Sequence, residues 1–262
     1  MGTLALIGLG SNLGDRETRL DTAVAALAKT PGVQVRAVSS YRETAPVGGP
    51  AGQGPFLNAA VRLETALDPG ALLAELRRIE QDAGRLRTVR WGERTLDLDL
   101  LIFGSLVLDT PELALPHPRF ALRRFVLAPL VEIAPEIVDP VTGRTIADLL
   151  ANLDRRPSIL VLTRGTPLRD EVFQGAVAGL SAREIRQTDR PADPWSPERI
   201  GDRWVVADFR VDSPTFVVLL DETSGLTPPA RAAPVPVLRP SETDPTAIIA
   251  EVLATCAATR EK

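Results

Sequence analysis

The hydrophobic pattern of the first 150 residues predicts short strands that alternate with amphipathic helices. Apolar or alternating stretches typical of strands cover residues 4–10, 33–42 and 57–64. Apolar residues recur at helical spacing over about residues 15–29 and 68–83. Together with a later acidic strand, the order is strand, helix, strand, strand, helix, strand. This order predicts an α+β domain of the ferredoxin-like type, with the helices on one face of the sheet.

The pattern then changes and restarts near residue 156. A stretch over 43–55 is rich in glycine and proline and predicts an irregular loop, and 126–133 and 145–153 add helical or irregular elements. Beyond residue 156, the pattern predicts two helices and three strands, the helices over 168–180 and 245–259, and the strands over 158–163, 204–209 and 215–220. We therefore expect two domains, 1–155 and 156–262, of which the second is a smaller α/β domain of unknown function.

Two carboxylates lie inside the apolar strand expected over residues 94–103. Asp97 and Asp99 are two positions apart, and a strand directs such side chains to one face. Unpaired carboxylates there would repel each other and resist the loss of water. A divalent metal, or a pair of metals, would satisfy them. The alternative is a half-exposed strand whose polar face carries both residues.

A basic segment leads into this strand, and it contains Arg85, Arg87, Arg90 and Arg94. The guanidinium fork suits phosphate oxygens, and the flanking Gly84 and Gly92 predict a mobile loop. An arginine loop beside paired carboxylates indicates polyphosphate transfer. The alternative, a solvated basic loop, explains any one of the arginines but not their occurrence together with the two carboxylates.

Two further features of the chain bear on phosphate binding. Gly8, Gly10 and Gly14 are spaced one residue too widely for the dinucleotide fingerprint, and no Gly-Lys-Ser/Thr follows them. They predict a tight turn that caps the helix beginning near Asp15. His117, the only histidine, lies between two prolines and near three arginines, so we expect it to contact phosphate.

These segments together resemble the 6-hydroxymethyl-7,8-dihydropterin pyrophosphokinase family over about residues 3–153. The matching motifs are GLGSNLGDR at 8–16, SSYRETAPVG at 39–48, FLNAAV at 56–61, GRLRTVRWGERTLDLDLLIFG at 84–104 and PHPRFALRRFVLAPLVEIAPEIVDP at 116–140. The resemblance implies an ATP-dependent enzyme of folate biosynthesis. Such an enzyme transfers pyrophosphate from ATP to the hydroxymethyl group of the pterin, giving AMP and the pterin diphosphate. The alternative is a nucleotide-binding regulatory module with a degenerate kinase site, whose output lies in the second domain.

The resemblance also implies roles for individual residues. The catalytic residues would be Arg85, Arg94, Asp97 and Asp99, and the two aspartates would hold two Mg²⁺ ions that bridge the ATP phosphates. Contacts to ATP would come from Glu80, Arg87, Arg90, Arg94, His117 and Arg123. The pterin would be bound by Thr44, Val47, Phe56, Asn58, Trp91 and Phe125. The residues themselves leave other roles open: Glu80 as a surface carboxylate, Phe56 and Phe125 as core residues, and His117 as a weak general base.

Composition narrows the class of protein. A net charge of −4 argues against general binding to nucleic acid or membrane surfaces. The single cysteine, Cys256, excludes an internal disulfide and fits a reducing cytosol, and no apolar run approaches the ~20 residues of a membrane span. We expect a cytoplasmic enzyme whose partners are ATP and a pterin, with self-association through the second domain as one possibility.

Overall fold

A computed structural model describes residues 2–47, 50–85 and 92–154, and beyond them five short strands and the last helix. The chain forms two compact units, the first over residues 1–150 and the second over 151–260. Each unit is described by itself. The expected domain boundary at residue 155 stays a prediction.

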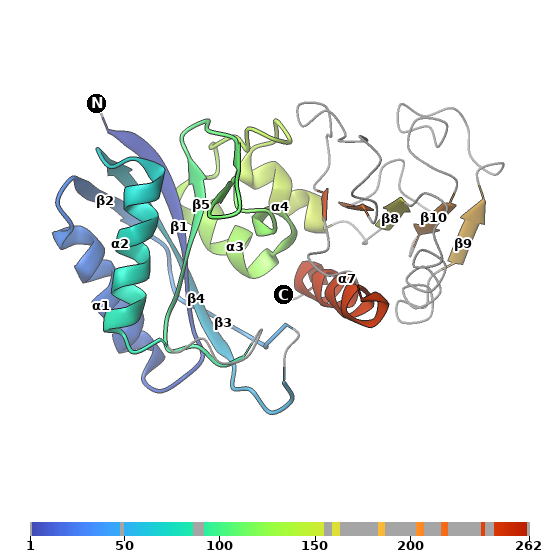
Figure 1. The fold of residues 1–262 in the computed structure, drawn as a ribbon, viewed down its shortest axis with the longest axis horizontal. Coiled ribbons are helices and arrows are strands. Elements are labelled where there is room, and N and C mark those ends of the chain that lie inside the picture. Colours follow the sequence, from blue (N-terminus) through green and yellow to red (C-terminus); the bar gives the residue numbers. More distant parts are fainter. Residues whose placement is uncertain are drawn as a thin grey trace. The chain divides into compact units, whose positions relative to one another are not determined.

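An antiparallel sheet forms the middle of the first unit (Figure 1). β1 (Thr3–Ser11) lies between β4 (Phe56–Thr65) and β5 (Asp97–Phe103), and β2 (Val33–Val38) pairs with the other side of β4. The order β2-β4-β1-β5, with a helix after β1 and another after β4, is the ferredoxin-like arrangement. The predicted fold class is therefore confirmed. A short strand, β3 (Arg42–Thr44), also pairs with β4.

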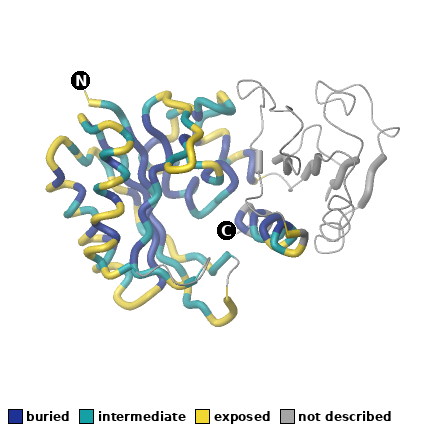
Figure 2. The backbone as a smooth tube through the Cα atoms, in the orientation of Figure 1, coloured by how far each residue is buried: buried dark blue, intermediate teal, exposed yellow. Residues whose placement is uncertain are grey.

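Two helices cover one face of this sheet, and each begins at an aspartate that caps it. The side chain of Asp15 accepts the Thr18 N–H at the start of α1 (Arg16–Lys29), and Asp68 accepts the Ala71 N–H before α2 (Pro69–Asp82). The apolar stripes of both helices and the inner face of the sheet form one core, which includes Ile7, Leu20, Leu27, Leu63, Leu72, Leu76 and Leu98 (Figure 2). The opposite face of the sheet carries the polar side chains of Asn58, Asp97 and Asp99, together with the buried Leu6 and Leu101.

The chain after β5 folds back beside that strand. It forms a hairpin of β6 (Leu108–Asp109) and β7 (Ala114–Leu115), the short 3₁₀ helix η1 (Phe120–Leu122), α3 (Arg124–Ile133) and α4 (Ile146–Asp154). The Leu115–Pro116 peptide is cis. The His117 N–H donates to the Leu101 carbonyl at 2.8 Å, which fixes the segment after the hairpin against β5.

Two sequence predictions for this unit are wrong in detail. The strand expected over 33–42 is divided into β2 and β3, because Ser39 turns its hydroxyl to the Ala60 N–H at 2.9 Å and interrupts the run. The turn expected from Gly8, Gly10 and Gly14 involves only Gly14, with φ +69°, whereas Gly8 and Gly10 lie inside β1, in agreement with the strand expected over 4–10. Neighbouring strands pair with β1 on both sides, which keeps it extended through its glycines.

The second unit contains a parallel sheet in the order β12-β11-β8, formed by β8 (Ile159–Leu162), β11 (Phe216–Leu219) and β12 (Val237–Leu238). A separate antiparallel pair consists of β9 (Arg183–Arg186) and β10 (Arg203–Val206). α7 (Pro245–Arg260) begins after Asp244, whose carboxylate accepts the Ala247 N–H at 2.8 Å.

The pattern correctly predicted β8, β10, β11 and the final helix. It did not predict β9, and the helix expected over 168–180 lies outside the described residues. Within the described part of the chain, none of the helices combines the length and apolar character needed to cross a membrane.

Candidate active site

Asp97 and Asp99 lie on one face of β5. Leu98 and Leu100 alternate with them and belong to the core, while the two aspartate side chains are 16% and 34% exposed. β5 is at the end of the described sheet order, next to β1 only. The spacing therefore predicted correctly that both carboxylates share one face, and that face is partly exposed, as in the alternative of a half-exposed strand.

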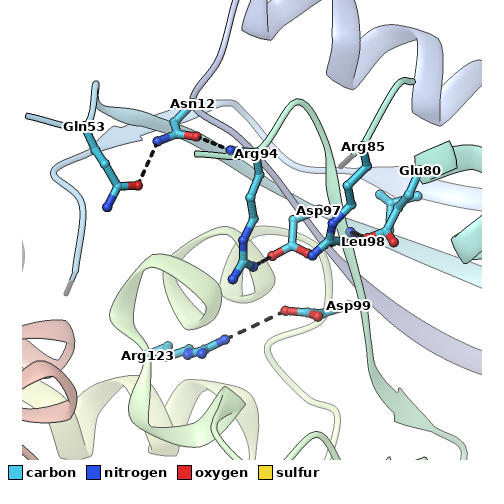
Figure 3. Close-up of polar contacts among 9 residues, drawn as sticks. All are labelled: Asn12, Gln53, Glu80, Arg85, Arg94, Asp97, Leu98, Asp99 and Arg123. Atoms are coloured by element: carbon cyan, nitrogen blue, oxygen red, sulfur yellow. Dashed lines mark hydrogen bonds and ion pairs between the residues drawn. The ribbon is translucent and has the colours of Figure 1, made fainter. Parts of the chain in front are cut away.

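Arginines pair with both oxygens of the Asp97 carboxylate (Figure 3). Arg85 Nη1 lies 2.5 Å from Oδ1, and Arg94 Nη1 donates to Oδ2. Arg85 also forms an ion pair with Glu80, and Glu80 Oε1 accepts the Leu98 N–H at 2.7 Å. Glu80, Arg85, Asp97 and Arg94 thus form a chain of alternating charges along the edge strand.

Glu80 is a buried residue of α2, with 4% of its surface exposed. The alternative that it is a surface carboxylate is therefore wrong. A buried carboxylate without partners is costly, and the Arg85 guanidinium and the Leu98 N–H remove that cost. Its expected contact with ATP stays a prediction.

Asp99 lies among cationic groups. Burial acts to raise its pKa, but nearby positive charge outweighs burial and holds the pKa of this carboxyl below its ordinary value; the charge comes from Arg123, Arg94 and Arg85, and from His117 when that ring is protonated at low pH. Arg123 Nη1 is 3.8 Å from Asp99 Oδ2, and its guanidinium lies 5.6 Å from the centroid of the Phe125 ring. Asp99 is consequently ionised at neutral pH, as a metal ligand must be.

His117 lines the site, and one of its ring nitrogens is already hydrogen-bonded. Its Nδ1 accepts the Arg119 N–H at 3.2 Å. Burial lowers the pKa of His117, and although Asp99 opposes this, Arg123 reinforces it. The ring is then neutral at pH 7 with its proton on Nε2, so it can donate to a phosphate oxygen. Because Nδ1 is already engaged, this arrangement does not favour the alternative of a general base.

A cavity of about 350 Å³ opens beside these side chains. Its lining brings together residues expected to bind ATP or metal or to act in catalysis, namely Glu80, Arg85, Arg94, Asp97, Asp99, His117 and Arg123. Five arginines and four carboxylates contribute to the lining in all. Such a mixture of charges suits a polyphosphate that binds together with cations.

The residues expected to bind the pterin begin on the neighbouring strands. Thr44 of β3 pairs with Phe56 of β4, and Asn58 Nδ2 donates to Thr44 Oγ1 at 2.8 Å. Asn58 is 6% exposed, whereas Phe56, Val47 and Phe125 are half-buried. Neither Phe56 nor Phe125 belongs to the hydrophobic core, so the core-packing alternative does not fit.

Three expected site residues, Arg87, Arg90 and Trp91, lie outside the described residues. Their roles stay predictions.

Asn12, to which the sequence reasoning gave no role, links two parts of the site (Figure 3). Its Oδ1 accepts the Arg94 N–H at 2.7 Å, and its Nδ2 donates to Gln53 Oε1 at 3.4 Å. Gln53 lies in the segment between β3 and β4, and Arg94 precedes β5. One amide therefore joins the segments before the two strands that carry Asn58 and Asp97.

Arg16 makes a second connection that the sequence reasoning missed. Its Nη1 donates to the Pro55 carbonyl and its Nη2 pairs with Glu43, both at 2.8 Å. These contacts tie both ends of the segment between β3 and β4 to the start of α1. The available signal was the motif GLGSNLGDR, which contains both Asn12 and Arg16.

Comparison with known proteins points to one family. The model described as 7,8-dihydro-6-hydroxymethylpterin-pyrophosphokinase (HPPK) matches residues 6–135. A Bacillus subtilis protein named 2-amino-4-hydroxy-6-hydroxymethyldihydropteridine pyrophosphokinase is 49% identical over 143 residues, which cover 55% of this chain and 85% of that protein. Proteins of the same name from Synechocystis and Methylorubrum extorquens are 43% identical over 150 residues and 45% identical over 152 residues. These matches cover 57% and 58% of this chain, and 76% and 94% of the relatives.

Proposed function

The chain belongs to the 7,8-dihydro-6-hydroxymethylpterin-pyrophosphokinase family, and we propose that the site around β5 carries out the reaction of that family. The enzyme transfers a pyrophosphoryl group from ATP to the hydroxymethyl group of 6-hydroxymethyl-7,8-dihydropterin, giving AMP and the pterin diphosphate in folate biosynthesis. The regulatory-module alternative has no support among these relatives. The observation that carries the assignment of the site is the pair Asp97 and Asp99, which share a cavity with Arg85, Arg94 and Arg123.

Two Mg²⁺ ions, held by Asp97 and Asp99, are part of this proposal. Mg²⁺ is commonly bound through one or two carboxylates, with substrate phosphates and waters as its other ligands. When bound, the ions would neutralise and orient the phosphates. Because arginines pair with both Asp97 oxygens, metal binding would turn Arg85 or Arg94 from Asp97 toward phosphate.

The protein's contribution to the transfer is positioning and charge stabilisation. A bond forms between the hydroxymethyl oxygen and the β-phosphorus of ATP. The bond from that phosphorus to the oxygen that bridges it to the α-phosphorus breaks, and AMP leaves with this oxygen. The hydroxyl proton passes to solvent. Arg85 and Arg94 would stabilise the charge that develops on the phosphates, while Glu80, His117 and Arg123 would hold ATP. Arg87 and Arg90, assigned by resemblance alone, would add phosphate contacts.

The pterin would bind beside Thr44, Phe56 and Asn58, which lie on β3 and β4. Asn58 offers an amide whose orientation is fixed by Thr44 at 2.8 Å, so its donor and acceptor are set for a polar ring edge. The half-buried Phe56 and Phe125 offer ring faces to a flat heterocycle. The resemblance alone assigns Val47 and Trp91 to the pterin site. Cytoplasmic location, the absence of nucleic-acid partners and self-association through the second unit stay predictions.

Release of AMP by the full chain tests this proposal. We expect AMP only when ATP, the pterin and Mg²⁺ are all present, and we expect EDTA to abolish it. Asp97→Asn and Asp99→Asn should each lower the rate about 100-fold or more, while Asp109→Asn on β6 should not. Titration of Mn²⁺ by electron paramagnetic resonance, with a non-hydrolysable ATP analogue bound, should count two ions in the wild type and fewer in both site variants. Near-normal AMP release by either site variant would contradict the assignment.

A further inference from the structure

Gly10 lies between the two halves of the site. In β1 it pairs with Asn58 of β4 on one side and with Asp97 of β5 on the other. Since neighbouring strands are about 4.8 Å apart, the backbones of Asn58 and Asp97 are separated by about 9.5 Å with Gly10 between them. The amide expected to recognise the pterin and the carboxylate expected to hold metal therefore face each other across one residue without a side chain.

A side chain at this position would enter the space between them. A Cβ added at Gly10 would lie 3.3 Å from Asn58 Oδ1, 3.9 Å from Phe56 Cδ1 and 4.0 Å from Asp97 Cβ. The first of these distances is closer than ordinary van der Waals contact, so the Asn58 amide would have to move. That amide is held by Thr44 and is 6% exposed, which leaves it little room.

The backbone gives no other reason for glycine here. Gly10 is not among the glycines with positive φ, so its conformation suits any residue. Glycine in the interior of a strand weakens the strand, and such a position often marks the close approach of a ligand. The reason for glycine at this position is consequently the space that it leaves.

We propose that Gly10 is a specificity-determining residue for the pterin substrate, whose flat ring system lies over its bare backbone. One edge of the two-ring heterocycle would be recognised at Asn58, and its hydroxymethyl arm would extend toward Asp97. Because Gly10 has no side chain, a flat molecule of this kind can lie over the backbone and span the distance from Asn58 to Asp97. This inference rests on the proposed function and adds to it the path between the two half-sites.

Gly8 provides a matched control. It lies on the same face of β1 two residues earlier, and its φ is also outside the left-handed region. A Cβ added at Gly8 would meet Leu101 Cδ1 at 3.3 Å, the end of a flexible side chain, and its three nearest atoms all belong to Leu101. Gly8→Ala therefore changes the same strand without entering the space beside Asn58 and Phe56.

Steady-state AMP release by the full chain tests the proposal, with the pterin varied at saturating ATP. Gly10→Ala should raise the KM for the pterin about tenfold or more, because one methyl group occupies the path of the substrate. The Kd of a non-hydrolysable ATP analogue should stay within about twofold, and Gly8→Ala should change neither constant beyond that. Gly10→Val should abolish pterin-dependent AMP release while the ATP analogue still binds.

Several results would overturn the proposal. One is an unchanged pterin KM in Gly10→Ala, and another is an equal rise in Gly10→Ala and Gly8→Ala. A Gly10→Ala protein that does not fold, or that loses ATP binding to the same extent, would assign Gly10 a structural role instead. A wild-type chain without pterin-dependent AMP release would overturn the proposed function itself, which separates the two failures.

Discussion

At the scale of the residue, Asp97 is the point where the charges of the site meet. Its carboxylate forms ion pairs with Arg85 and Arg94, and the buried Glu80 forms a further ion pair with Arg85. Because positive and negative charges alternate, ion pairs hold the side chains of both arginines in place. The cavity of about 350 Å³ beside them stays open. Glu80 is then a support of the site as well as a candidate ligand of ATP.

Replacing Glu80 tests this support. Glu80→Gln keeps an acceptor for the Leu98 N–H but removes the charge beside Arg85, so we expect the free energy of unfolding to fall by about 1–3 kcal/mol. Denaturant unfolding of the full chain measures the change. Glu75→Gln on the same helix is the control, because Glu75 pairs with Arg78 in a more exposed position, and its loss should cost about 0.5 kcal/mol or less. Equal effects of the two substitutions would contradict the supporting role of the Glu80 charge.

Local spacing predicted the shared face of Asp97 and Asp99, but it could not predict the burial of Glu80. The i, i+2 rule needs only the strand, whereas the surroundings of Glu80 depend on the Leu98 N–H, which is 18 residues away in the sequence. Gly10 is a similar case. The role proposed for Gly10 depends on Asn58 and Asp97, and it is strand pairing that places these two residues on either side of it.

At the scale of the element, two helices hold the short strand β3 in place. Glu132 of α3 accepts the Ser40 N–H at 2.8 Å and pairs with Arg42 at 2.6 Å. Arg16 at the start of α1 pairs with Glu43. β3 carries Thr44, so these contacts set the position of the residue that orients Asn58.

Substitution of Arg16 tests its part in this arrangement. Arg16→Ala removes the hydrogen bond to Pro55 and the pair with Glu43, and loss of about 1 kcal/mol of positioning would raise the KM for the pterin about fivefold. The Kd of the ATP analogue should not change. Arg36→Ala is the control, because Arg36 pairs with Glu64 at 2.6 Å and lies on β2, outside the segment between β3 and β4. A pterin KM that is the same in both variants would contradict the role of Arg16.

The stability of the first unit should depend on pH through Glu132. Burial acts to raise the pKa of this carboxyl, but hydrogen bonds from Ser40 and Arg42 outweigh it and hold the pKa below its ordinary value. The stabilisation is therefore complete above the ordinary glutamate range and is lost as pH falls through the lowered pKa. Glu132→Gln should reduce the free energy of unfolding by about 1 kcal/mol at pH 7 and by less at pH 3. Unfolding curves that stay equally far apart at both pH values would contradict this account.

The helices were predictable because their signals are local. Asp15 and Asp68 cap α1 and α2 within three residues, and the apolar stripes follow at once. The break between β2 and β3 was not predictable, since it follows from the contact of the Ser39 hydroxyl with Ala60 on another strand.

At the scale of the whole molecule, the family match lies within the first unit. The match covers residues 6–135, and the described site residues all lie inside that range. The second unit contains a parallel sheet, to which the comparisons assign no function. We therefore expect the chemistry to belong to the first unit.

A truncated chain tests that expectation. Residues 1–155 keep α4 (Ile146–Asp154) whole, whereas a cut after residue 150 would remove its last turn with the buried Asn152 and Leu153. The 1–155 protein should keep kcat and the KM for the pterin within about threefold of the full chain. A folded 1–155 protein without activity would make the second unit part of the working enzyme.

The most direct test of the central claim is the identity of the phosphorus products. Phosphorus-31 NMR of the full chain with ATP, Mg²⁺ and 6-hydroxymethyl-7,8-dihydropterin should show AMP and the pterin diphosphate rising together in equal amounts. ADP with a pterin monophosphate, or AMP that appears without the pterin, would contradict pyrophosphoryl transfer at the site formed by Asp97 and Asp99.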